Sequence, residues 1–349
     1  MSKRKLALAF ILSVIVIVGV PVFAGTILWV RMTDLYRGYD EAEQFVQIPQ
    51  GAGTADIGRR LVDGGVVKDT WAFRAAVWWT GAGRTLKAGE YRFDRPISAV
   101  SVVEKIARGD VYGRRVTFPE GLTIAEMAKL YESHGLGKAA DFVAAARDVS
   151  RVADLDPGAR DLEGYLFPET YTLPRGIPAA RLVDLMVDRF HAVFTEEMRQ
   201  LATAQGRTVR EIVTLASLVE KETAQAEERP LVAAVYRNRM KIGMGMQADP
   251  TVVYALQKAG RYDGNIRRED LAFNSPYNTY RYPGLPPGPI ASPGKASLEA
   301  ALSPADVKSL YFVSRNDGTH VFADSLEAHN RNVQKFQVEY FRSQRRSNK

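Results

Sequence analysis

The feature that most constrains the fold of this chain is an uncharged stretch near its N-terminus, Leu6–Val30. As an α-helix, these roughly 25 residues would extend ~37 Å, enough to cross a hydrocarbon core about 30 Å thick. The basic residues of segment 1–5 precede the stretch, and basic flanks tend to stay in the cytoplasm. We therefore expect a cytoplasmic tail over 1–5, a transmembrane helix over 6–31, and everything after Arg31 on the outer side.

The alternative is a cleaved signal peptide, with Val22-Phe23-Ala24 as its small-residue cleavage site. We favour a retained helix because apolar residues continue through Val30. Both interpretations export the rest of the chain to a compartment without ATP, which argues against kinases and nucleotide-driven machines.

The composition excludes several classes of site. The chain has 349 residues, enough for two or three compact units, and no cysteine. Disulfides, thiolate metal sites and cysteine nucleophiles are therefore excluded. The four histidines are scattered and no Gly-rich phosphate loop occurs, so we expect neither a metal nor a cofactor. The net charge of +7 includes the basic N-terminal tail, and no Arg/Lys stripe with interleaved aromatics predicts nucleic-acid binding.

The exported part begins with a polar spacer over 32–43 and a first subdomain over 44–112. After a short strand and helix, the pattern predicts a second helix over Trp71–Trp79 and a strand over Leu86–Phe93. This strand–helix–helix–strand order is typical of LysM-like modules, which bind N-acetylglucosamine polymers. A spacer domain that binds nothing is the alternative.

Residues 113–345 form a second, mostly helical domain, in which we place the functional core at 160–335. Its segment Leu162–Tyr171 combines aromatic residues with two glutamates. Aromatic faces and carboxylates suit sugar rings, so Glu169 and Tyr171 are candidate substrate contacts. The alternative is a surface strand and turn that packs two helices.

The strongest helix signal in this domain is a capping box at Thr208-Val-Arg-Glu211, which predicts a helix to about Thr223. Glu220 and Glu222 lie on opposite shoulders of its apolar stripe. A carboxylate at such an edge is partly desolvated, which raises its pKa and suits a general acid. Helical geometry does not choose between the two, and both could instead be surface residues that pair with Lys221 or Arg229.

Two segments downstream supply further candidates. Asp249 is most simply the N-cap of a helix that starts at Pro250, whereas Gln247 has no such structural explanation and is a candidate site residue. The Pro-rich segment 274–288 must be an irregular, stiff loop, and it presents Tyr277, Asn278 and Tyr280. A hairpin over 309–323 and a final helix over 325–341 complete the domain.

Five motifs together resemble the YceG-like endolytic murein transglycosylases over roughly residues 40–340. They are 163–171 (EGYLFPETY), 216–223 (ASLVEKET), 238–252 (NRMKIGMGMQADPTV), 277–280 (YNTY) and 284–290 (GLPPGPI). The resemblance implies an α+β fold: an N-terminal transmembrane helix, a LysM-like βααβ subdomain, and a mixed α/β catalytic domain with a mostly helical core. It also implies a single-pass protein of the cell inner membrane with a periplasmic catalytic domain.

The implied reaction is cleavage of peptidoglycan between N-acetylmuramic acid and N-acetylglucosamine, leaving a 1,6-anhydromuramyl end, with termination of glycan elongation as its expected role. The family's catalytic glutamate maps onto Glu222, with Glu220 as the fallback. We hypothesise that Tyr277, Asn278 and Tyr280 bind sugar hydroxyls or the acetamido group, with Gln247 in support.

The competing hypotheses are a non-catalytic peptidoglycan-binding scaffold for the cell wall or division, and a hydrolytic muramidase. The partners we expect are peptidoglycan glycan strands and the inner membrane, with penicillin-binding synthases of the elongation and division machinery as candidates. Turnover on sacculi separates an enzyme from a scaffold, and the mass of the products separates a transglycosylase from a hydrolase.

Overall fold

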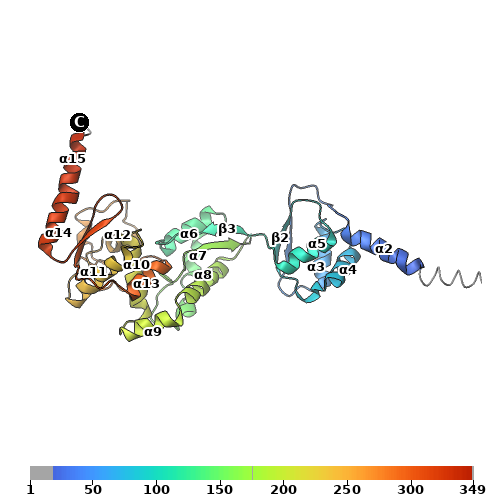
Figure 1. Ribbon diagram of the computed structural model, residues 1–349, viewed down its shortest axis with the longest axis horizontal. Coiled ribbons are helices and arrows are strands. Elements are labelled where there is room, and N and C mark those ends of the chain that lie inside the picture. Colours follow the sequence, from blue (N-terminus) through green and yellow to red (C-terminus); the bar gives the residue numbers. More distant parts are fainter. Residues whose placement is uncertain (1–18, 175, 348–349) are drawn as a thin grey trace, which may run out of the picture. The chain divides into compact units, whose positions relative to one another are not determined.

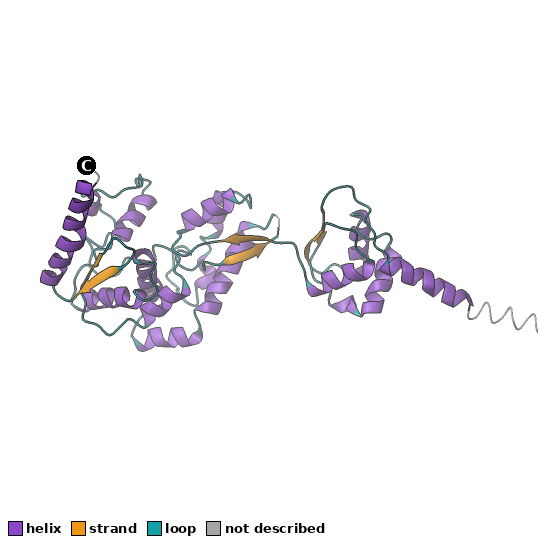
Figure 2. Ribbon diagram, turned by 45° about the horizontal axis from the view of Figure 1, so that its top comes forward, coloured by secondary structure: helices purple, strands orange, loops and turns teal. Residues whose placement is uncertain are grey.

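The computed structural model describes residues 19–174 and 176–347 (Figure 1). The chain divides into two compact units. The first is formed by the residues up to Arg114 and the short segment from Thr172, and the second by Arg115–Tyr171 and the residues from Gly176 on. Figure 2 shows that helices predominate, with strands limited to short pairs, so the fold is mixed α and β.

The first unit is built around the antiparallel pair β1–β2, in which Val46 lies opposite Tyr91. Phe73, Tyr91 and Phe93 are fully enclosed in its core. The predicted order strand–helix–helix–strand is observed. The elements are α2 (Val20–Thr33), β1 (Gln44–Ile48), α3 (Thr54–Asp63), α4 (Thr70–Thr80), η2 (Ala82–Arg84), β2 (Gly89–Phe93) and α5 (Ala99–Arg108).

The predicted transmembrane segment is described only in part. Residues 1–5 and the first part of the expected span, to residue 18, lie outside the described residues. Helix α2 covers the remainder of the apolar stretch. Among residues 19–174 and 176–347, no helix combines the length and the apolar character needed to cross a membrane.

The second unit is mostly helical. Its elements are β3 (Arg114–Thr117), α6 (Ile124–Ser133), α7 (Ala139–Ala145), η3 (Val149–Val152), β4 (Thr170–Leu173), α8 (Ala179–Val193), α9 (Glu196–Ala204), α10 (Val209–Glu222), α11 (Arg229–Lys241), α12 (Asp249–Lys258), η4 (Asp270–Ala272), α13 (Lys295–Leu302), β5 (Tyr311–Ser314), β6 (His320–Ala323), α14 (Leu326–Val333), η5 (Gln334–Glu339) and α15 (Tyr340–Ser347).

Helix α10 is the centre of this unit, and it forms as the sequence predicts. Thr208 and Glu211 make the reciprocal capping box that satisfies two N-terminal N–H groups. Every residue from Ile212 to Val219 is buried, because α11, α12 and α13 all pack against this helix. The C-terminal turn of α10 therefore emerges from the core, and Glu220 and Glu222 are part of that turn.

The final helix differs from the continuous one that the sequence predicts. A π-helical stretch, Gln334–Glu339, separates α14 from α15. The hairpin of β5 and β6 engages this stretch: the Asn316 side chain donates to the Phe336 carbonyl at 2.6 Å, and the Gln337 side chain donates to the Ser314 carbonyl at 2.8 Å. These long-range hydrogen bonds hold the irregular turn in place.

Candidate active site

Glu222, the last residue of α10, is largely buried and makes one strong hydrogen bond. Its Oε1 accepts from the hydroxyl of Tyr236, on α11, at 2.7 Å. Tyr236 is itself almost fully buried, at 1% exposure. The phenol fixes one carboxylate oxygen and leaves the other oxygen of the same carboxylate for a reacting group.

Arg239 lies one turn after Tyr236 and is also buried. Its guanidinium donates to the carbonyls of Met246 at 2.5 Å and Leu310 at 2.7 Å. These bonds attach the turn before α12 and the start of the β5–β6 hairpin to α11. Because Tyr236 and Arg239 share one side of α11, the attached segments lie beside Glu222.

A second carboxylate accompanies Glu222. Asp249 accepts a hydrogen bond from the hydroxyl of Tyr280 at 2.6 Å, and its negative charge acts on Glu222. The sequence predicts Asp249 as an N-cap, and this is wrong. Ala248 occupies that position, Asp249 is the first residue of α12, and no side chain caps the helix. The Asp249 carboxylate bonds Tyr280 of a distant loop instead.

Burial raises the pKa of Glu222 to about 6, against the lowering effect of the Tyr236 hydrogen bond. The charge of Asp249 raises this pKa further, whereas His320 and Arg239 lower it. A carboxyl group with such a pKa keeps a protonated fraction near neutral pH, as a general acid requires.

His320, which acts on Glu222, is bound to the buried side chain of Glu228. Its Nδ1 lies 2.7 Å from Oε2 of Glu228, and its backbone N–H donates to Oε1 of the same residue at 2.6 Å. The Thr223 hydroxyl also donates to Glu228, at 3.0 Å. Glu228 thus joins the end of α10 to strand β6 and orients the turn that follows Glu222.

Glu220 is a structural residue by its contacts. It lies 3.4 Å from Arg229 and accepts from the backbone N–H of Gly294 at 3.0 Å. Its side chain is only 6% exposed. Both oxygens of this carboxylate are therefore occupied, and the sequence alternative of an ion pair with Arg229 holds for Glu220 alone.

The hydroxyl groups of two buried threonines fix the position of the 274–288 loop. The side chains of Thr251 and Thr279 lie 2.9 Å apart, and Thr279 also accepts from the Ala248 N–H. Gln247 is exposed, adopts a positive φ of 51° and donates its N–H to the Thr279 carbonyl. This contact joins Gln247, two residues before Asp249, to Thr279, the residue before Tyr280.

Asn278 is fully buried and serves the loop itself. Its side-chain amide donates to the Leu271 and Phe273 carbonyls at 3.0 and 2.8 Å. Its Oδ1 accepts from the N–H of Tyr280 at 3.0 Å. The side-chain amide that we expected to bind a sugar is thus used within the loop. Asn278 instead positions Tyr280 through the bond to its backbone N–H.

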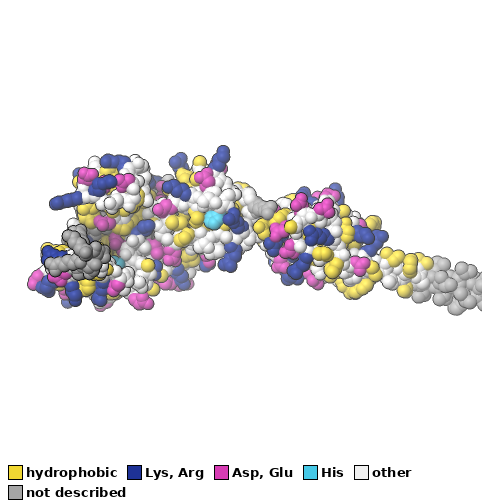
Figure 3. Space-filling model, turned by 90° about the horizontal axis from the view of Figure 1, so that it is seen from above, with side chains coloured by type: hydrophobic (Ala, Val, Ile, Leu, Met, Phe, Trp, Pro, Cys, Tyr) yellow, Lys and Arg dark blue, Asp and Glu magenta, His cyan; other side chains and the backbone are white. Residues whose placement is uncertain are grey.

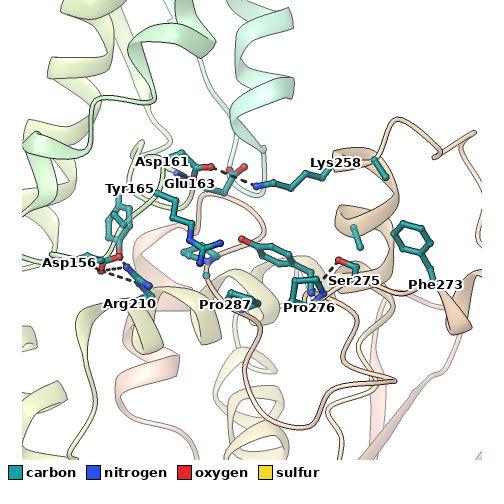
Figure 4. A pocket seen from close by; sticks show the side chains of 18 of the residues that line it. Asp156, Asp161, Glu163, Tyr165, Arg210, Lys258, Phe273, Ser275, Pro276 and Pro287 are labelled. Atoms are coloured by element: carbon teal, nitrogen blue, oxygen red, sulfur yellow. Dashed lines mark hydrogen bonds and ion pairs between the residues drawn. The ribbon is translucent and has the colours of Figure 1, made fainter.

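Tyr277 faces a separate cavity of about 410 Å³, whose lining does not include Glu222. Figure 4 shows this cavity, with the Asp156–Arg210 ion pair on one side and Lys258 on another. The Lys258 ammonium lies 5.4 Å from the centre of the Tyr277 ring, and the Tyr254 ring contacts that ring in a tilted arrangement, with ring centres 4.9 Å apart. Tyr277 therefore contributes an aromatic wall next to a cation.

Glu169 and Tyr171 have partners of their own. Glu169 pairs with Arg189 of α8 at 2.5 Å, and the Tyr171 hydroxyl donates to the Phe167 carbonyl at 2.7 Å. None of these partners belongs to the Glu222 cluster. The structure therefore does not bring the two residues together with Glu222.

Sequence reasoning missed Tyr236, Arg239 and the role of Asp249. The available signal was the pair of polar residues Tyr236 and Arg239 at i and i+3 in an otherwise buried helix. Within the described part of the chain, no group of three or more His, Cys, Asp or Glu side chains is arranged to hold a metal ion.

Comparison with known proteins gives consistent matches over most of the chain. The profile of the YceG-like family matches residues 46–335. The endolytic murein transglycosylase of Bacillus subtilis (strain 168) is 31% identical over 309 residues, which cover 83% of this chain and 84% of that protein. The endolytic murein transglycosylase of Streptococcus pneumoniae (strain ATCC BAA-255 / R6) is also 31% identical, over 82% of this chain but only 57% of its own length.

Among solved structures, a YceG-like protein from Listeria monocytogenes aligns with a TM-score of 0.57 at 31% identity. The alignment covers 83% of this chain and 98% of the Listeria chain. The two proteins therefore share their fold.

The contacts of the two glutamates predict a loss of stability on substitution of Glu220 and none on substitution of Glu222. Glu220→Gln removes the charge that faces the buried Arg229, so we expect a loss of about 2–4 kcal/mol in the free energy of unfolding. Glu222→Gln removes a carboxylate whose ionised form is disfavoured by burial, so we expect no loss at pH 7. Urea unfolding of both variants measures this, and equal destabilisation would contradict it.

Proposed function

The chain belongs to the YceG-like family, and we propose that it is an endolytic peptidoglycan lytic transglycosylase that cleaves the MurNAc–GlcNAc bond and leaves a 1,6-anhydroMurNAc end. The observation that supports this most is the buried Glu222 carboxyl, which a phenol holds through one oxygen beside a second carboxylate. The names of the relatives support the same activity.

In this mechanism, protonated Glu222 donates its proton to the glycosidic oxygen, and the bond to C1 of the muramyl residue breaks. The ionised Glu222 then takes the proton of the muramyl 6-hydroxyl, whose oxygen forms the new bond to C1. The proton that left Glu222 is thereby replaced, and no water is consumed. One carboxyl group serves as acid and then as base.

Asp249 acts on this cycle through its charge. Its carboxylate raises the pKa of Glu222 and so favours the protonated acid before cleavage. The same negative charge stabilises the positive charge that develops on the sugar ring as the bond breaks. Tyr236 fixes the orientation of the acid throughout, because it bonds Oε1 only.

The 274–288 loop gives the strand a path away from Glu222. Tyr280 contacts Asp249, whereas Tyr277, three residues earlier, lines the cavity of Figure 4. Three Cα steps of 3.80 Å place these two residues at most ~11 Å apart. A polymer bound at Glu222 and Tyr280 therefore extends to Tyr277, where an aromatic wall and Lys258 suit a sugar face and its acidic substituents. Gln247 adds an exposed amide on the Asp249 side.

We also propose that the chain is a single-pass protein of the inner membrane, with residues 1–5 cytoplasmic and the catalytic unit periplasmic. The uncharged stretch Leu6–Val30 after a basic tail supports this. The first unit, with its βααβ order, is the proposed LysM-like subdomain, and glycan elongation is the process that cleavage would end.

A hydrolytic muramidase is the second candidate, because Asp249 supplies a second carboxylate whose charge acts on Glu222. An inverting glycosidase uses a second carboxylate as the base that activates water. A non-catalytic scaffold is supported less well, because it has no use for a buried acid with a raised pKa.

Product analysis tests the proposal directly. Wild-type protein should release fragments that carry 1,6-anhydroMurNAc, lighter by one water than the reducing ends of a hydrolase. Glu222→Gln should lower turnover about 10²–10⁴-fold, the usual contribution of a general acid. Mass spectrometry of digested, purified glycan strands measures both. Reducing ends from wild type would replace the proposal with the muramidase, and an active Glu222→Gln would refute the site.

The pH profile should respond in opposite directions to two substitutions. Since protonated Glu222 is the acid, kcat/KM should fall as pH rises through about 6. Asp249→Asn removes a charge that raises this pKa, so the fall should move to lower pH, on the order of one unit. Tyr236→Phe removes a bond that lowers it, so the fall should move to higher pH. Profiles that shift together would contradict the arrangement.

The cavity predicts a dependence on strand length. Tyr277→Ala should raise KM about fivefold for long strands, by loss of an aromatic contact, and leave a short fragment that ends before the cavity unaffected. Tyr277→Phe, which keeps the ring, is the matched control and should behave as wild type. An equal effect of Tyr277→Ala on both substrates would show that the cavity is not part of the strand's path.

A further inference from the structure

All four tryptophans of the chain lie on one part of the first unit, and all are exposed. Trp71, Trp78 and Trp79 belong to α4 and are 69%, 81% and 56% exposed. Trp29 of α2 is 46% exposed and contacts Trp79 edge to face, with ring centres 4.9 Å apart. We call these four side chains the tryptophan patch.

One face of α4 packs into the core of the first unit, and the tryptophan patch lies on its opposite, outer face. Ala72, Phe73, Ala76 and Val77 are the buried residues of α4. Trp71 and Trp78, seven residues apart, point to the opposite side, together with Arg74. Exposing several aromatic rings of this size to water is costly in free energy, so their grouping indicates that another molecule or a membrane covers them.

Two arginines flank the patch, one on each helix. Arg74 is the only charged residue of α4, and its guanidinium lies 5.4 Å from the Trp71 ring centre. Arg31 is the only charged residue of α2, and it pairs with Asp69, the N-cap of α4, at 3.4 Å. This ion pair and the Trp29–Trp79 contact fix α2 against α4, so the patch is continuous with the apolar surface of α2.

Hydrophobic side chains cover α2 where it leaves the first unit (Figure 3). Val22, Phe23, Ile27, Leu28 and Val30 are all exposed along it. In the sequence, this surface continues into the uncharged residues that precede α2. The patch therefore lies at the point where the proposed membrane segment ends and the first unit begins.

We infer that the tryptophan patch seats the first unit on the lipid surface, with α4 lying in the interface between headgroups and acyl chains. Tryptophan is enriched at this depth because its ring is apolar and its indole N–H reaches water. Arg74 and Arg31 then face anionic headgroups. A sugar ligand fits less well, since α4 carries no carboxylate or amide side chain to bond hydroxyls.

The inference rests on the membrane part of the proposed function and goes beyond it. An anchor alone would leave α4 free in water, whereas a seated α4 holds the first unit at a fixed height above the bilayer.

The test uses tryptophan emission in the full chain, reconstituted into phosphatidylcholine–phosphatidylglycerol vesicles. All four native tryptophans belong to the patch, so they are kept and serve as the reporters. Phosphatidylcholine brominated near the carbonyl end of its acyl chains quenches only indoles at interface depth. We expect the tryptophan emission to be lower in brominated than in unbrominated vesicles.

The control carries no native tryptophan and has Leu201→Trp, at a 48%-exposed position of α9 in the second unit, and it should not be quenched. Co-flotation with the vesicles is measured on the same samples. If the chain floats but the native tryptophans are not quenched, the inference is wrong and the anchor stands. If the chain does not float, both are wrong. Emission that responds to glycan fragments or to protein concentration, and not to lipid, would assign the patch to sugar or to a second copy.

Discussion

The structure depends on how the C-terminal turn of one buried helix leaves the core. Helix α10 is enclosed from Ile212 to Val219, and two glutamates follow within three residues. Both side chains are largely enclosed, but their hydrogen-bond partners differ. Glu220 has Arg229 and the Gly294 N–H, whereas Glu222 bonds the neutral phenol of Tyr236. This difference gives Glu220 a structural role and leaves Glu222, whose pKa is raised by burial, as the proposed acid.

The surrounding fold maintains that difference with parts that are far apart in the sequence. Glu228 joins the end of α10 to β6, Arg239 attaches the turn before α12 to α11, and Thr279 attaches the proline-rich loop to the same turn. Each contact is a hydrogen bond to a buried group, and such bonds are costly to leave unmade. The acid is therefore positioned by a rigid frame, which is the condition for electrostatic catalysis.

The sequence predicted correctly those features that depend on residues close together in the chain. The capping box and apolar stripe predicted α10, because both involve residues within one or two turns. They did not choose between Glu220 and Glu222, because the deciding partners lie as far as 74 residues away. Asp249 shows the same limit: the rule for an Asp before Pro predicts a cap, but Tyr280, 31 residues on, takes its carboxylate. The burial of Asn278 was within reach, since Asn in turns commonly bonds its own loop.

The arrangement of the second carboxylate favours intramolecular attack over hydrolysis. A water-activating base needs an oxygen directed at the water, on the far side of the sugar from the acid. Asp249 instead accepts the short bond from Tyr280, and its charge acts on the same cluster that holds Glu222. It therefore serves best as a fixed negative charge beside the acid. In the proposed mechanism no second base is needed, because the 6-hydroxyl of the muramyl residue returns the proton to Glu222.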